Sequence, residues 1–117
     1  MRKLDLQNYV FNLPDEKGIL RFITYDFHKS LEGILPHPNL GLTGPELMKA
    51  MEVVEKVKKS KDEILLNEDD YKLIINTLNK FRGFTKNDHE FLKRIYNCPV
   101  VPDGKTVKFD NNGKGGK

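Results

Sequence analysis

The three histidines and their acidic neighbours are the first places to look for chemistry. His28, His37 and His89 are too scattered for a metal-binding pair on one helix, and the single cysteine leaves no thiol pair for zinc. His89 lies between Asp88 and Glu90, a trio that could assist hydrolysis if it converged. Consecutive residues at a helix start point in different directions, so the trio cannot meet at one substrate atom. We predict no metal site, and a hydrolase using His89 is the least favoured class.

Other catalytic motifs are equally weak. Gly41 and Gly44 lack the further glycine and the Lys-Ser/Thr ending of a phosphate-binding loop. Cys98 has no neighbouring base in the sequence to activate it, so we expect a buried structural thiol. The sequence therefore predicts no enzyme, no cofactor and no small-molecule substrate.

Basic side chains offer an alternative function, nucleic-acid binding. They outnumber acidic ones by only 20 to 17, a net charge of +3, which is mild for such a protein. The candidate contacts are Lys56, Lys58, Lys59, Lys61, Arg82, Lys86, Lys93 and Arg94. The last four surround a glycine-containing turn between two short helices, an arrangement typical of a helix-turn-helix. However, Asp88 and Glu90 at the start of the second helix would repel phosphate.

Three segments that each carry apolar residues at helical spacing must position these groups. Thr43 opens the first as a capping residue, and this helix is expected to run to about Lys58. Asn67 opens the second, which we expect to end at Gly83 in a left-handed conformation. Thr85 opens a third, shorter helix.

Extended segments precede these helices. Leu4–Phe11 and Ile19–Tyr25 predict an N-terminal β-hairpin, with Gly18 taking a positive φ in the turn. Two strands alone are marginal in water, so the hairpin must either lean on the helices or pair with a strand from elsewhere. An unpaired strand edge is a ready interface. A short helix is expected from Asp26 to Leu35, and an extended connector at Ile64–Leu66.

Composition and pattern together predict an α+β fold, an N-terminal β-hairpin packed on a small bundle of three main helices plus one short helix. Hydrophobic residues make up 38% and charged residues 32%, as in soluble globular domains, and no apolar run approaches the roughly 18 residues of a membrane helix. We expect one compact domain over residues 1–100. Residues 101–117 are expected to form a C-terminal arm or small hairpin, disordered from about 111. No apolar stretch follows the basic start, which favours a cytoplasmic location.

A resemblance adds a biological context. It is carried by Lys3–Tyr9, Leu42–Leu47, Glu63–Tyr71, Gly83-Phe84 and Asn87-Asp88. In these segments the chain resembles small uncharacterised proteins encoded by tailed bacteriophages and prophages of Gram-positive bacteria. The resemblance implies a role in virion assembly or in binding and modulating a host protein, in the host cytoplasm or the virion. It implies no reaction and no functional residues.

We therefore predict a non-enzymatic protein-interaction module. Its partner is another protein or a second copy of the chain, and no membrane contact is expected. The contact would be made through a strand edge or the extended arms, because neither is stable alone. The candidate interaction residues are Tyr9, Phe11, Phe22, His37, Val107 and Phe109.

Overall fold

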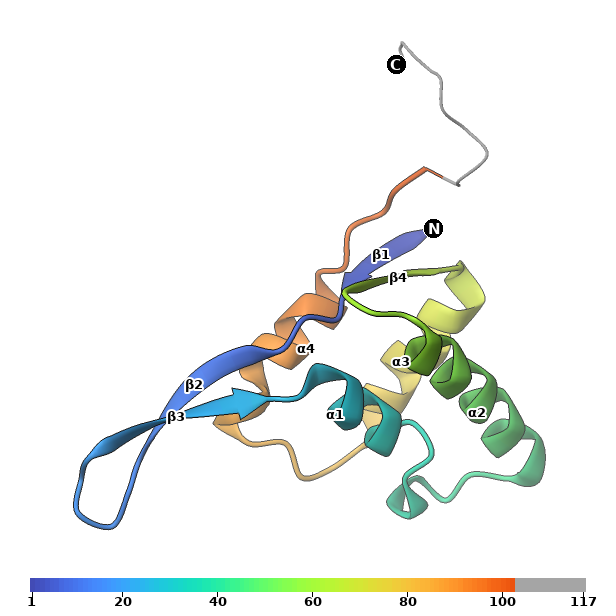
Figure 1. Ribbon diagram of the computed structural model, residues 1–117. Helices are drawn as coiled ribbons and strands as arrows, with labels where there is room; N and C mark the ends of the chain where they lie inside the picture. Colours follow the sequence, from blue (N-terminus) through green and yellow to red (C-terminus); the bar gives the residue numbers. More distant parts are fainter. Residues whose placement is uncertain (103–117) are drawn as a thin grey trace, which may run out of the picture.

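A computed structural model describes residues 1–102 of the chain. The predicted C-terminal arm beyond residue 102, with Val107 and Phe109, lies outside the described residues. The elements are β1 (Arg2–Asp5), β2 (Tyr9–Pro14), β3 (Leu20–Tyr25), α1 (Phe27–Ile34), α2 (Gly44–Lys59), β4 (Glu63–Leu66), α3 (Glu68–Lys80) and α4 (His89–Tyr96), with 3-10 turns at Pro38–Leu40 and Lys86–Asp88. The α+β prediction is confirmed. The β2–β3 hairpin extends away from the helices (Figure 1).

The first predicted strand is in fact two strands. β1 pairs antiparallel with β4, with Leu4 opposite Ile64, so the expected connector at 64–66 is a strand. β2 pairs only with β3 in the described part of the chain. The break has a local cause, because the Asp5 carboxylate accepts a hydrogen bond from the amide of Gln7 and bends the chain between the two strands. Leu4 can then point into the core while the hairpin leaves it.

The predicted helix starts are confirmed by their caps. The hydroxyl of Thr43 accepts from the amide of Glu46, while the Glu46 carboxylate accepts from the amide of Thr43. The side chain of Asn67 accepts from the amide of Asp70 at the start of α3. Asp26 caps α1 in the same way. These side chains satisfy amides that have no partner within the helix.

The end of α3 differs from the prediction. The helix stops at Lys80, and Phe81 is already extended, so Gly83, with a φ of +120°, lies beyond the helix end. Phe81 leaves the helix because its ring packs against Phe84, with ring centroids 5.0 Å apart. Thr85 caps the 3-10 turn Lys86–Asp88, and α4 begins only after it.

The core lies between the helices and the inner side of the β1–β4 pair. Phe27 of α1 and Phe91 of α4 are fully buried with ring centroids 4.8 Å apart. Leu4, Ile64 and Leu66 bring the small sheet into the same cluster. Over residues 1–102, every helix is too short or too polar to cross a membrane.

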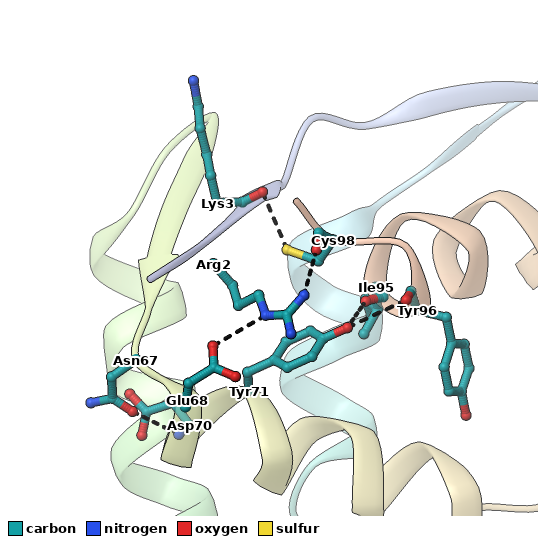
Figure 2. A network of polar contacts seen from close by, with 9 residues as sticks. All are labelled: Arg2, Lys3, Asn67, Glu68, Asp70, Tyr71, Ile95, Tyr96 and Cys98. Carbon is teal, nitrogen blue, oxygen red and sulfur yellow. Dashed lines mark hydrogen bonds and ion pairs between the residues drawn. The ribbon is translucent and has the colours of Figure 1, made fainter. Parts of the chain in front are cut away.

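A polar network closes this core where the two ends of the described chain meet (Figure 2). The Arg2 guanidinium lies 4.4 Å from the centre of the Tyr71 ring and donates to Glu68 and to the carbonyl of Cys98. The Cys98 thiol donates to the carbonyl of Lys3 at 3.2 Å. Burial raises the pKa of Cys98, which keeps the thiol protonated, as expected of a structural cysteine.

Candidate interaction surface on the β-hairpin

The turn of the hairpin fixes the pairing of its strands. The amide of Gly18 donates to the carbonyl of Asp15, and the amide of Asp15 donates to the carbonyl of Ile19. Gly18 has a φ of +80°, a backbone conformation that residues with a side chain rarely adopt. These bonds and the positive φ of Gly18 are typical of a three-residue loop in which a type I turn is followed by a left-handed glycine. It sets the register in which Phe11 faces Ile23 and Asn12 faces Phe22.

The Asp15 carboxylate holds this turn in shape. One of its oxygens accepts from the amides of Ile19 and Lys17, each at 2.9 Å, and the other lies 3.4 Å from Nε of Arg21. The hydrogen bond from Ile19 lowers the pKa of Asp15, and those from Lys17 and Arg21 act in the same direction. The turn is thus fixed by its own residues without help from the helices.

The base of the hairpin is fixed by two stacked tyrosines. The rings of Tyr9 and Tyr25 are 4.6 Å apart and nearly parallel. The Tyr9 hydroxyl donates to the carbonyl of Asn87 and accepts from the amide of Phe91, and the Tyr25 hydroxyl donates to Asp88 at 2.5 Å. Burial raises the pKa of both tyrosines, and in Tyr25 the hydrogen bond to Asp88 raises it further. The hairpin therefore leaves the body from a firm attachment at the start of α4.

Arg94 belongs to the same attachment. Its guanidinium lies over the rings of Tyr9 and Phe27, at 5.2 and 5.3 Å, and pairs with Glu90 at 2.8 Å. It also donates to the carbonyl of Gln7 at 2.6 Å. Only 16% of the Arg94 side chain is exposed, so this residue holds the hairpin base.

Beyond the base, one side of the hairpin is both apolar and exposed. We call this the outer face, and its members alternate along the strands: Val10, Asn12, Pro14, Leu20, Phe22 and Thr24. Val10 is 58%, Leu20 61% and Phe22 79% exposed. The opposite side carries Tyr9 and Tyr25 into the core. A group of neighbouring apolar side chains with such large exposed fractions usually marks a surface that contacts another molecule.

The two edges of the hairpin differ. Hydrogen-bonded and non-hydrogen-bonded pairs alternate in an antiparallel ladder, and the Asp15–Ile19 pair is hydrogen-bonded. The next hydrogen-bonded pairs along the ladder are therefore Leu13–Arg21 and Phe11–Ile23. The residues of β3 that lie between them, Leu20, Phe22 and Thr24, point their backbone N–H and C=O groups away from β2. On the other edge, Pro14 removes one of the outward amides. The β3 edge is therefore the more complete template for a further strand.

The predicted interaction residues fall into separate places. Tyr9 and Phe11 lie partly buried at the hairpin base, and Phe22 is more exposed than Val10 and Leu20 on the outer face. The Nδ1 atom of His37 accepts from the amide of Asn39, and the His37 ring lies edge-on to Phe81, 5.1 Å away. His37 thus caps the 3-10 turn Pro38–Leu40, which follows α1 in the chain.

Sequence reasoning missed Val10 and Leu20 as members of this surface. The signal was present, since β3 carries apolar residues at both alternating positions, which is unusual for a strand with one solvated face. A turn that ends at Gly18 pairs Pro14 with Leu20, and alternate residues of a strand point to the same face. This pairing would then have placed Val10, Leu20 and Phe22 on one face of the hairpin.

The basic candidates are spread over α2, the loop that follows it, the segment between α3 and α4, and α4 itself. Three of them form the following ion pairs. Lys56 lies 2.6 Å from Asp70, Lys58 lies 3.7 Å from Glu55, and Arg94 is paired as described. Lys59, Lys61, Arg82, Lys86 and Lys93 are exposed.

A groove between α2 and α3, of about 680 Å³, is lined by Leu42, Ala50 and Leu73 together with acidic and basic side chains. One of these, Glu46, has a lowered pKa because it accepts the capping hydrogen bond from the Thr43 amide. Within residues 1–102, no cluster of three or more His, Cys, Asp or Glu is placed to hold a metal ion.

Comparisons of the chain with models of protein families, with curated proteins and with solved structures give no match. The function is therefore inferred from the hairpin itself.

Proposed function

We propose that this protein is a non-enzymatic protein-interaction module that binds its partner through the β2–β3 hairpin. The observation that carries the proposal is the exposure of Val10, Leu20 and Phe22 on one face of a hairpin whose two ends are fixed. Exposing apolar area costs roughly 25 cal/mol per Å² relative to burying it, so a partner that covers this face gains that energy.

The rigidity of the hairpin supports the same proposal. Ordering a flexible segment on binding reduces affinity, because conformational entropy is lost at that moment. Here Asp15 fixes the turn, and Tyr9 and Tyr25 fix the base, before any partner arrives. A role in phage virion assembly or in modulating a host protein would use such a preformed contact element.

The test is site-specific photo-crosslinking. A photoreactive phenylalanine analogue replaces Phe22, and in a matched control it replaces Met48, an exposed apolar residue of α2 that is 67% accessible. We expect covalent adducts with a protein, identified by mass spectrometry, from position 22 and not from position 48. Equal yields from the two positions, or no adduct at either, would count against the hairpin as the contact element.

A further inference from the structure

We infer that the hairpin's partner is a second copy of the same chain, joined edge to edge through β3 to form a four-stranded antiparallel sheet. This inference rests on the proposed function and specifies its partner. It starts from the outward backbone groups of Leu20, Phe22 and Thr24, three alternate residues centred on Phe22. Because they are evenly placed around one residue, two β3 strands can meet about a twofold axis at Phe22.

This register uses every outward group of β3. Phe22 faces Phe22 of the second copy, and Leu20 faces Thr24 of the second copy at either side. Each of these pairs exchanges two backbone hydrogen bonds, about six in all. A shift by two residues in either direction leaves only two such pairs within the strands. The full set of backbone bonds therefore selects the register centred on Phe22.

The charges fit the same register. Arg21, the single charged residue of β3, faces Ile23 of the second copy, so two like charges are not placed directly opposite each other. Continued past the strand ends, the same register puts Gly18 level with Asp26 of the second copy, so the turn that carries Lys17 lies toward that carboxylate. By symmetry, the same approach of opposite charges occurs at both ends of the joint strand. β2 is a poorer edge, because Pro14 has no amide to offer there.

The joint sheet also brings the apolar outer faces of the two copies side by side on one surface of the sheet. Phe22 side chains of the two copies lie beside each other on this face, flanked by Leu20 and Val10. The contact is small by the standards of protein interfaces, so we expect a monomer–dimer equilibrium that depends on concentration.

The experiment uses the full chain in sedimentation velocity over a concentration series up to about 1 mM. Thr24→Pro removes an outward amide of β3 while leaving the bonds to β2, and Asn12→Pro is the matched change on the opposite edge. We expect the wild type and Asn12→Pro to dimerise, and Thr24→Pro to weaken the dimer on the order of tenfold or more. A wild type that stays monomeric throughout, or a dimer unaffected by Thr24→Pro, overturns the inference.

Disulfide trapping decides the matter if a proline variant unfolds. Phe22→Cys would place two thiols at the twofold axis, with Cα atoms about 5.5 Å apart, within disulfide reach. Val10→Cys, on the same face but the far strand, is the control, and native Cys98 is buried. Trapping at position 22 alone supports the inference, and equal or no trapping overturns it. If position 22 instead crosslinks to a different protein, the inference fails and the proposed function stands.

Discussion

The hydroxyl of Tyr25, the last residue of β3, donates to the Asp88 carboxylate at the start of α4, 63 positions along the chain. This contact joins the hairpin to the helical body together with the hydrogen bonds of the Tyr9 hydroxyl to Asn87 and Phe91, and the rings of Tyr9 and Tyr25 are stacked. The direction in which the hairpin projects, and hence which face it exposes, is set here.

Replacing Tyr25 by Phe is expected to lower the free energy of unfolding by about 1–3 kcal/mol, because a partly buried hydrogen bond to a carboxylate is lost. Chemical denaturation measures the change. Tyr96→Phe is the matched control, since its hydroxyl also bonds a side chain, Asn79, but at the exposed surface. A loss as large in Tyr96→Phe would argue against a special role for the Tyr25 contact.

Stability should fall at alkaline pH. The folded-state pKa of Tyr25 is raised above its ordinary value of 10.0, first by burial and then by Asp88. The protonated form is therefore favoured in the folded state, so its contribution is complete below pH 10 and is lost as pH rises towards the folded pKa. The free energy of unfolding should drop by up to about 1.4 kcal/mol per pH unit for this group. Tyr25→Phe should show a shallower fall, and parallel curves would refute the assignment.

Replacing Asp15 by Ala should loosen the turn of the hairpin without unfolding the body, because its carboxylate accepts from two turn amides. Amide hydrogen exchange should quicken at Lys17 and Ile19 and stay unchanged in α2. The pKa of Asp15 is lowered in the folded state, so its contribution is present above the unfolded pKa and is lost as pH falls through the folded one. Acidifying the wild type should therefore loosen the same amides, and an unaltered turn at low pH would contradict this account.

Replacing Thr43 by Ala removes the capping hydroxyl of α2 and should cost about 1 kcal/mol of stability. Thermal or urea unfolding reports the loss. Thr43→Ser keeps the hydroxyl and should stay close to the wild type. A full loss in the serine variant would place the effect elsewhere than in the cap.

Local rules were enough to predict much of the fold. The caps at Thr43 and Asn67 and the positive φ of Gly18 follow from neighbouring residues, so the helix starts and the hairpin could be read from the sequence. The end of α3 at Lys80 could not be predicted from the sequence, because it depends on the contact between the rings of Phe81 and Phe84.

The candidate surface depended on contacts between distant parts of the chain. Which face of the hairpin is exposed follows from Tyr9 and Tyr25 meeting Phe91, and sequence spacing does not reveal that meeting. Phe22 could be named as a candidate from its type alone. Val10 and Leu20 required the register set by the turn.

The most direct test of the central claim is residue-resolved amide hydrogen exchange in β3, recorded on dilute protein. We predict rapid exchange at Phe22 and Thr24, whose amides point away from β2, and slow exchange at Ile23, whose amide bonds to Phe11. Protection of Phe22 and Thr24 equal to that of Ile23 in the dilute chain would mean that the edge is already covered, and would contradict an open binding edge on this hairpin.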